Sequence, residues 1–303
     1  MSMRSLPCLR EETYRGKSLR ESGGQNRQAA PNRFRIFLYL AKIFMDRFIF
    51  NHNNRQIMKK IITCLLATLG LTTACSQQKA ENMDVFQTKS GKSVTFQALV
   101  HASIRIQYDG KEIEIDPVSK LGERTIPYAT MPKADYIFVT HEHFDHFDKE
   151  AIATLSSDKT KLITNQRCAE MLGKGQAMAN GETLRLTDDI TVEAVPAYNT
   201  TEGHQQFHPK GRDNGFILTI DGLRIYIAGD TEDIPEMADI KNIDIAFLPC
   251  NQPYTMTTDQ LVRAAKIIKP KVVFPYHYSQ TDVSQLPAQL KDEGIEVRIR
   301  HYE

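Results

Sequence analysis

The sequence has few cysteines, no short-period repeat and no apolar run long enough to cross a bilayer. Five cysteines stand among 303 residues and nothing in their spacing pairs them, which argues against a fold held together by a disulfide framework. Cys168 and Cys250 are expected to be buried free thiols. The apolar stretches stay below the ~20 residues that a membrane-spanning helix needs. A hydrophobic fraction of 41% nevertheless suffices for a core.

Basic charge is also scarce in the body of the chain. The net charge is +1, but residues 1–60 hold 13 of the 38 Lys and Arg residues and only 4 of the 37 acids. The remaining residues therefore hold 25 basic and 33 acidic side chains. Nucleic-acid binding needs a basic track, so no nucleic-acid partner is expected. An envelope nuclease would need a local basic stripe near its site, and that alternative stays open.

Residues 58–75 have the composition of a bacterial lipoprotein signal peptide. Two lysines follow Met58, fourteen uncharged and mostly apolar residues come next, and the segment ends in Thr-Thr-Ala-Cys75. Such a run is of secretory type and too short to span a membrane. Its ending resembles a lipobox, in which Cys75 is lipidated and becomes the first mature residue. The alternative is a buried core helix that happens to contain a cysteine.

This interpretation divides the chain into parts. Met58 is expected to be the initiator, so residues 1–57 would be an upstream extension absent from the native protein. Residues 76–92 are polar and predict a tether between the lipid anchor and a folded domain over residues 93–303. The anchor predicts a location in the bacterial cell envelope, with the membrane as a partner and a small-molecule or lipid-like substrate.

Two hairpins organise the expected domain. Asp109-Gly110 and Asp221-Gly222 each separate two alternating apolar runs, which is a strong hairpin signal. Strands and helices alternate after each hairpin. The expected helices are 149–155, 166–172 and 257–269, and the further strands are 161–164, 190–195, 243–248 and 271–275. This pattern favours a single α+β domain with sheets inside and helices outside.

The motif His141-Glu-His-Phe-Asp-His146 follows a strand-like run over residues 135–140. Three imidazoles and a carboxylate within six residues are ligands that suit Zn²⁺ and its first-row neighbours. Strand alternation directs His141 and His143 to the same side, while Asp145 and His146 curl behind them. The motif predicts a metal site for two ions. The alternative is a histidine-rich surface loop.

Two more candidate ligands also follow predicted strands. Asp230 comes after the second strand of the second hairpin, and His277 comes after the strand over residues 271–275. Taken alone, Asp230 could be a helix cap and His277 a core histidine. Because both stand where strand ends meet at one rim, we expect them to join the histidine motif.

These motifs together resemble the metallo-β-lactamase superfamily over residues 93–303. Four details are similar to the metal-dependent hydrolases related to L-ascorbate-6-phosphate lactonase: His101-Ala-Ser103, Ile113-Glu-Ile-Asp-Pro117, Tyr226-Ile-Ala-Gly-Asp-Thr231 and Pro275-Tyr-His-Tyr278. The resemblance implies a four-layer αββα sandwich with the metals at one edge. It also implies a hydrolase.

The resemblance further implies a ligand set. His141 and His143 would hold one ion, Asp145, His146 and His277 the second, and Asp230 both. The strand over residues 192–195 is not followed by the histidine that many members have there, so the first ion needs another ligand. His208, beside Pro209, is preferred to His204. His101 and Asp116 are expected to support ligands by accepting or donating hydrogen bonds behind them.

The implied chemistry is hydrolysis by a water shared between two metal ions, with Asp145 as the catalytic residue that orients it and passes on its proton. Zinc is the first expectation, and Mn²⁺ or Fe would also suit the ligands. The superfamily's substrates include lactones, phosphoesters, N-acyl phospholipids and β-lactams, and the sequence does not choose between them. The alternative is a non-catalytic metal-binding lipoprotein of the envelope, which would have a closed coordination sphere.

Overall fold

Two mixed sheets of seven strands each form the centre of the fold in the computed structural model, which describes residues 82–302. The first sheet contains, in spatial order, β1 (Met83–Gln87), β2 (Ser93–Ala98), β3 (Ile104–Tyr108), β4 (Lys111–Ile115), β7 (Tyr136–Val139), β8 (Lys161–Thr164) and β9 (Gln176–Ala177). The second contains β10 (Thr183–Arg185), β11 (Ile190–Ala197), β12 (Asp213–Ile220), β13 (Leu223–Ile227), β14 (Ile245–Pro249), β15 (Val272–Tyr276) and β16 (Glu296–Val297).

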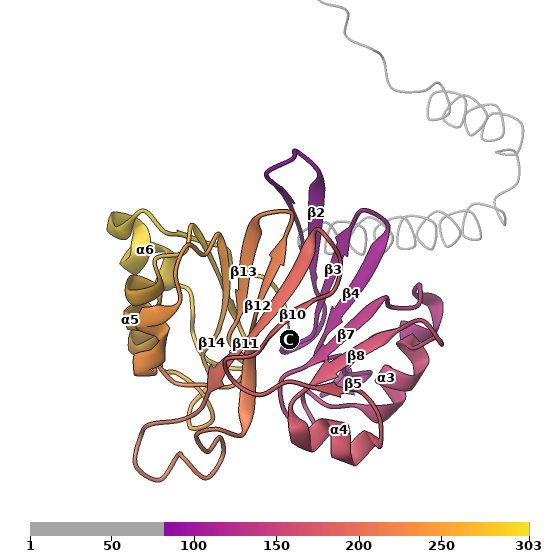
Figure 1. The fold of residues 1–303 in the computed structure, drawn as a ribbon. Coiled ribbons are helices and arrows are strands. Elements are labelled where there is room, and N and C mark those ends of the chain that lie inside the picture. The colour runs from indigo at the N-terminus through magenta and orange to yellow at the C-terminus, as the bar shows by residue number, and fades with distance from the viewer. Residues whose placement is uncertain (1–81, 303) are drawn as a thin grey trace, which may run out of the picture. The chain divides into compact units, whose positions relative to one another are not determined.

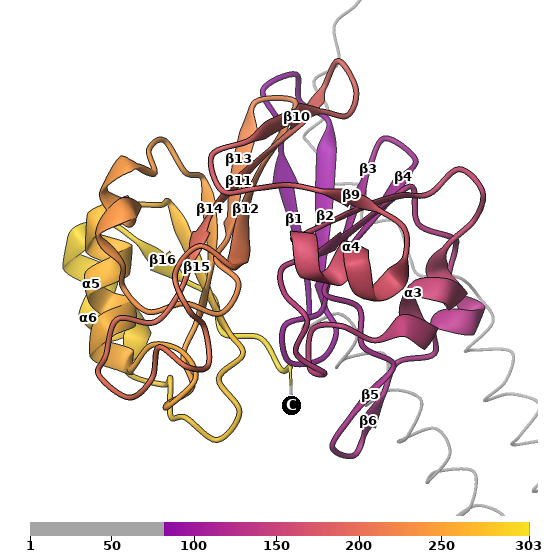
Figure 2. The same ribbon diagram turned by 60° about the horizontal axis from the view of Figure 1, so that its bottom comes forward.

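Helices cover the outer face of each sheet (Figure 1). On the first sheet lie α3 (Lys149–Leu155) and α4 (Gln166–Leu172), and on the second α5 (Thr258–Ile268) and α6 (Leu286–Leu290). The rotated view in Figure 2 keeps the two helix pairs on opposite sides and shows the small hairpin of β5 (Lys120–Leu121) and β6 (Arg124–Thr125) projecting from the first half. Short 3₁₀ helices span Tyr128–Thr130, Pro235–Asp239 and Lys291–Glu293. The expected αββα sandwich is confirmed.

The main core lies between the two sheets. Phe138 of β7 contacts Phe216 of β12 with ring centroids 5.4 Å apart, and Phe96 of β2 lies 5.9 Å from Phe247 of β14. All four rings are buried. A smaller core under α3 and α4 includes Ile152. Because each sheet is packed on both faces, its position relative to the other is fixed, and so are the loops that leave the strand ends.

Both predicted hairpins are present. Asp109 and Gly110 have φ of 49° and 75°, and Asp221 and Gly222 have φ of 45° and 77°. Positive φ at both central residues marks the type I′ turn, whose twist matches that of the flanking strands. The turns set the register of β3 with β4 and of β12 with β13.

The helix predicted over residues 257–269 is also present as α5. Thr257 and Gln260 form a capping box at its start, and the helix ends at Lys269, whose φ is 55°. Its apolar face, including Leu261 and Ala265, is buried in the main core. The capping residues and the apolar periodicity indicate the same helix, which is why the sequence predicted it.

The expected tether over residues 76–92 is wrong for the part that the structure describes. Residues Met83–Gln87 form β1, an edge strand paired antiparallel to β2. Asp84 is buried in ion pairs with Arg298 and Arg300, 2.9 and 2.7 Å away. The folded domain therefore begins before residue 93.

The structure does not describe the other predicted parts of the chain. Outside the described residues lie the extension over residues 1–57, the signal peptide over residues 58–75 with Cys75, and residues 76–81. Among residues 82–302 no helix is both long and apolar enough to cross a membrane. Cys168 and Cys250 are buried free thiols, as expected.

Candidate metal centre

The candidate ligands come from strand ends on both sheets. The histidine motif follows β7, Asp230 follows β13 and His277 follows β15. Strands β4 and β7 are parallel, as are β13, β14 and β15, so their carboxyl ends meet at the same edge of the sandwich. His208 lies in the loop between β11 and β12. Residues separated by more than a hundred positions thereby reach one place.

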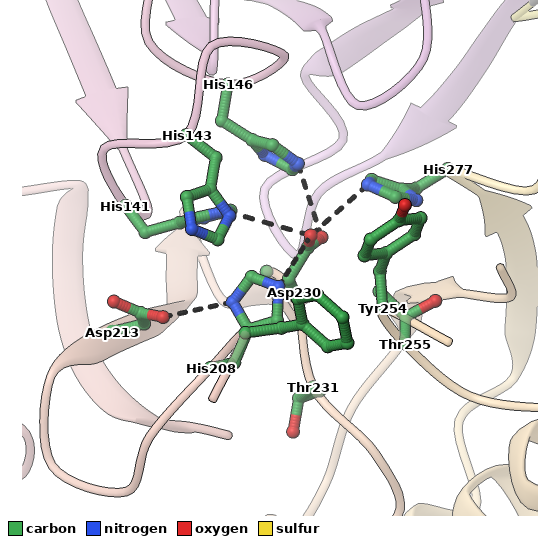
Figure 3. A network of polar contacts seen from close by, with 12 residues as sticks. His141, His143, His146, His208, Asp213, Asp230, Thr231, Tyr254, Thr255 and His277 are labelled. Carbon is green, nitrogen blue, oxygen red and sulfur yellow. Dashed lines mark hydrogen bonds and ion pairs between the residues drawn. The ribbon is translucent and has the colours of Figure 1, made fainter. Parts of the chain in front are cut away.

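The Asp230 carboxylate lies at the middle of these side chains (Figure 3). Both of its oxygens face imidazole Nε2 atoms: Oδ1 is 3.2 Å from His146, and Oδ2 is 3.2 Å from His277, 3.3 Å from His208 and 3.7 Å from His141. Asp230 is only 2% exposed. A single buried carboxylate among four histidines has the position that a residue bridging two ions would need.

The imidazoles form two trios around Asp230. The first trio is His141, His143 and His208, with ring centroids 4.6, 4.9 and 4.7 Å apart. The second trio is His101, His146 and His277, at 6.0, 3.8 and 5.1 Å. The ligand atoms of the first trio with Asp230, and of the second trio with Asp145, lie within 4.8 Å of one another in each set. Four ligands is the usual number at a zinc site.

His101 lies closer to the centre than the sequence suggested. It was expected to support a ligand, but it belongs to the second set itself. Its Nε2 is 3.2 Å from Asp145 Oδ2, and its backbone accepts a 3.0 Å hydrogen bond from the amide of His277. The structure therefore places His101 at ligand distance in the second set.

His208, and not His204, reaches the cluster. His204 stands outside both sets, with Nδ1 3.3 Å from Glu232 Oε1 and a partly exposed side chain. His208 is buried, with Nε2 facing Asp230. The structure thus supplies the additional candidate ligand at the preferred position, while its binding role stays a prediction.

Buried oxygens fix the orientation of three rings through Nδ1. These contacts join His146 to Asp116 Oδ2 at 2.8 Å, His208 to Asp213 Oδ2 at 3.1 Å and His141 to Thr140 Oγ1 at 3.0 Å. With Nδ1 held by an acceptor, Nε2 is the atom of each ring that faces Asp230. Asp116 has the supporting position that the sequence suggested.

Asp213 and Thr140 were not predicted as site residues. Thr140 directly precedes the histidine motif, and its hydroxyl donates to Asp116 Oδ2 at 2.7 Å. Asp213 is held by the Arg212 guanidinium at 2.7 Å and begins β12. The sequence signal was available only for Thr140, as the last residue of the predicted strand. For Asp213, the fold of the loop after His208 decides the contact.

The charges of the site are strongly coupled. Burial alone would raise the pKa of Asp230, but His146 and His277 hold it well below its usual range. Burial would lower the pKa of His277, whereas Asp230 and Asp145 raise it to about 9. Burial together with His146 lowers the pKa of His141 well below its usual value. A cation binding at His277 competes with a proton, so its affinity falls as the pH falls.

The left-handed backbone conformation recurs at the site. His101, Asp116 and His277 have φ of 54°, 43° and 49°. Such values are uncommon for residues other than glycine and persist where the surroundings enforce them. At His101 and His277 the enforcing contacts include the hydrogen bond that joins their backbones.

A cavity of about 700 Å³ opens onto these residues. His143, Asp145, His208 and Asp230 line it, together with the β5–β6 hairpin on one side and Tyr254 on another. The cluster is therefore reachable by a small molecule.

A family model described as the β-lactamase superfamily domain matches residues 95–277. The chain belongs to this superfamily. A UPF0173 metal-dependent hydrolase from Pelotomaculum thermopropionicum is 30% identical over 210 residues, which cover 65% of this chain and 90% of the relative. One from Ligilactobacillus salivarius is 37% identical over 187 residues, covering 59% and 82%.

Solved structures agree with this assignment to the metallo-β-lactamase superfamily. A protein from Parabacteroides distasonis assigned as a metal-dependent hydrolase is 52% identical, with a TM-score of 0.71 over 73% of this chain and 99% of that one. A metallo hydrolase from the archaeon Ignicoccus hospitalis is 26% identical, with a TM-score of 0.59 over 69% and 95%. The expected hydrolase of this superfamily is confirmed, and the closer relation to the ascorbate-phosphate lactonases stays a prediction.

The superfamily implies bound metal, and the buried atoms of the site fit it. Within the described residues, Nε2 of His146 and His208, both ring nitrogens of His277 and Oδ1 of Asp230 make no hydrogen bond. The Nε2 atoms of His146, His208 and His277 lie 3.2–3.3 Å from the Asp230 oxygens, but the directions do not suit hydrogen bonds. An unpaired buried polar atom costs about 1–3 kcal/mol. Converging imidazole and carboxylate atoms that do not bond one another are the donor set of a first-row divalent cation.

Proposed function

We propose that this metal-dependent hydrolase uses metal-activated water to cleave an ester, lactone, amide or phosphoester bond. The observation that carries the proposal is the convergence of two four-residue ligand sets at Asp230, beside an open cavity. Divalent cations bound by these residues would supply Lewis acidity that lowers the pKa of a bound water and polarises the bond under attack.

The residues of the chain have distinct parts in this scheme. His141, His143 and His208 would hold one cation, with Asp230 between the two. The second cation would be held by Asp145, His146 and His277, with His101 also at ligand distance. Asp145 faces the cavity, and its pKa lies below the usual range because His101 and His277 outweigh the effect of burial. As a carboxylate it can accept a hydrogen bond from the attacking water and so orient it. Asp116, Asp213 and Thr140 keep the rings in place.

A non-catalytic metal-binding protein is the second candidate. It would enclose its cation with protein ligands on all sides. Here five members of the two sets line a cavity that a substrate can enter, which favours catalysis. A nuclease is disfavoured because, among the described residues that line the cavity, Arg124 is the only Lys or Arg, whereas a polyanion needs several.

We also propose that the enzyme acts in the cell envelope, tethered through a lipid on Cys75. Only the sequence of residues 58–75 supports this location. Radiolabelled palmitate incorporation into the full chain, lost in Cys75→Ser, would test it.

The hydrolase proposal is tested with protein loaded with Zn²⁺, Mn²⁺ or Fe²⁺. We expect about two ions per chain by elemental analysis and turnover of at least one member of a panel of lactones, esters, acyl amides and phosphodiesters. His143→Ala and Asp230→Ala should abolish turnover with the fold retained, as judged by circular dichroism. His204→Ala, a histidine outside both sets, is the matched control and should stay active. Full turnover in Asp230→Ala would contradict the scheme.

A further inference from the structure

Aromatic side chains project into the cavity beside the candidate metal centre. Phe144 is 77% exposed, the largest value among the large apolar side chains of residues 82–302. Tyr254 is 45% exposed, and both line the cavity with Phe207. Exposed apolar surface concentrated in a concave site marks a place where a ligand covers it.

Two of these three rings belong to segments that carry candidate ligands. Phe144 stands between His143 and Asp145, and Phe207 directly precedes His208. The Phe207 and Tyr254 rings meet edge to face with centroids 5.0 Å apart. Phe144 and Phe207 therefore line the cavity together with their neighbouring candidate ligands, so an apolar group lying on these rings is held near the candidate metal centre.

Lysine and arginine are scarce among the described residues that line the same cavity. Arg124 is the one such side chain, and its guanidinium donates to the backbone carbonyl of His301 at 2.8 Å. Near His208, Lys210 is paired with Glu236 at 2.6 Å. A phosphate or other anionic substrate normally meets Arg or Lys donors, so this wall suits an uncharged group.

From these observations we infer the substrate class: an uncharged carboxylic ester or amide whose apolar acyl chain lies against Phe144, Phe207 and Tyr254. This inference rests on the proposed function. In the reaction the water oxygen bonds to the acyl carbon and the C–O or C–N bond breaks. One water proton goes to the leaving oxygen or nitrogen, and the other is released as the product carboxylic acid ionises.

The first experiment measures kcat/KM of the zinc-loaded full chain for p-nitrophenyl acetate, butyrate and octanoate. Full burial of a methylene is worth about fourfold, and the cavity is open, so we expect a rise of at least about tenfold from acetate to octanoate. A flat or falling series would overturn the inference. A kcat/KM for bis(p-nitrophenyl) phosphate above those of the three carboxylic esters would also overturn it, because the phosphodiester is intrinsically less reactive than the esters.

Variants then locate the apolar wall. In Phe144→Ala and in Tyr254→Ala the ratio of octanoate to acetate kcat/KM should fall severalfold, with the zinc content unchanged. Met171→Ala is the control. The Met171 side chain is 45% exposed, as is that of Tyr254, but it lies outside the cavity, so this variant should keep the parental ratio. Parental ratios in both aromatic variants would overturn the assignment of the wall.

A binding measurement separates this inference from the proposed function. Isothermal titration of the zinc-loaded chain with butanamide and decanamide should show tighter binding of decanamide, and Phe144→Ala should reduce the difference. Preferential decanamide binding without turnover of any lactone, ester, acyl amide or phosphodiester would overturn the proposed function but support the apolar site. Hydrolysis without any chain-length preference in binding or rate would overturn the substrate class alone.

Discussion

At the scale of single residues, the candidate site depends on buried acceptors behind the histidines. Asp116 and Asp213 are both fully buried, and each contacts a histidine Nδ1. Such partners fix the tautomer and direction of a ligand and commonly contribute 10–100-fold in metal affinity.

Asp213→Asn should weaken metal binding by roughly 10–100-fold, because an amide cannot give His208 and Arg212 the same two charged acceptor oxygens. Competition with a chromophoric zinc chelator measures the change. Asp188→Asn is the control, since the Asp188 side chain is 96% exposed and should bind zinc like the parent. Equal affinities in all three proteins would contradict the supporting role of Asp213.

Glu114 gives the domain a pH-dependent stability. Its carboxyl is buried and makes no hydrogen bond within the described residues, with Arg105 Nε 3.5 Å away. Burial raises the pKa of Glu114 to about 8, against the opposing effect of Arg105. Between its ordinary value and pH 8 the folded state keeps a proton that the unfolded state has lost. Stability therefore falls as the pH rises through this window.

The contribution of Glu114 to the free energy of unfolding should decrease by roughly 3 kcal/mol from pH 5 to pH 8. Glu114→Gln should flatten this dependence and stabilise the protein more at pH 8 than at pH 5. Urea unfolding at several pH values measures it. Glu170→Gln, an exposed glutamate, should keep the parental slope; an unchanged slope in Glu114→Gln would contradict the assignment.

At the scale of elements, one loop carries His208 and one buried carboxylate holds that loop. Glu232 Oε2 accepts hydrogen bonds from the amides and hydroxyls of Thr200 and Thr201 at 2.7–2.9 Å. The backbone amide of Asn199 donates to the backbone carbonyl of His208 at 2.9 Å. The position of His208 therefore depends on a glutamate two residues after Asp230.

Glu232→Gln should loosen this loop, because one carboxylate oxygen that accepts four hydrogen bonds is replaced by a group with a different balance of donors and acceptors. We expect affinity for one of the two ions to fall about tenfold, as for loss of a supporting partner, and the other to change little. Stepwise zinc titration resolves the two. Glu202→Gln in the same loop, exposed to solvent, should titrate like the parent. A uniform loss of both ions would contradict this account.

Elements with strong local signals were predictable from the sequence. The two Asp-Gly hairpins, α5 and the strand before the histidine motif have turn residues, caps or apolar runs that act locally. β1 was missed because Asp84 points inward, and its partners Arg298 and Arg300 are more than 200 residues away. β9 and β16 have two residues each, which is too short for any periodicity.

The candidate site followed the same rule. His141, His143, Asp145 and His146 form one local motif, and Asp230 and His277 follow readable strands. The position of His208 and that of His101 depend on how loops from the two sheets pack together. A local sequence pattern does not predict such contacts between distant loops.

At the scale of the whole molecule, the ligand sets join the two sheets. The first set combines His141 and His143, after β7 of the first sheet, with His208 and Asp230 of the second. The second set likewise combines His101 and His146 with His277. A bound cation would thus cross-link two halves of the sandwich, in addition to the apolar packing between the sheets and the ion pairs of Asp84 with Arg298 and Arg300.

Bound zinc should therefore raise the unfolding temperature of the whole domain. A ligand that binds only the folded state stabilises it by about 2.7 kcal/mol when present at 100 times its dissociation constant. Calorimetry with zinc and with a chelator measures the difference as a single shifted transition. The shift should shrink in Asp230→Ala and persist in Asp188→Asn. A zinc-independent transition in the parent would contradict the cross-linking role.

The left-handed backbones at His101, Asp116 and His277 have an evolutionary consequence. Glycine or asparagine would relax the chain at these three points, yet neither supplies an imidazole or a carboxylate there. Selection for activity and selection for a stable fold consequently oppose each other at these positions. Descendants of this protein that no longer hydrolyse a substrate could gain stability by substitutions at those three residues.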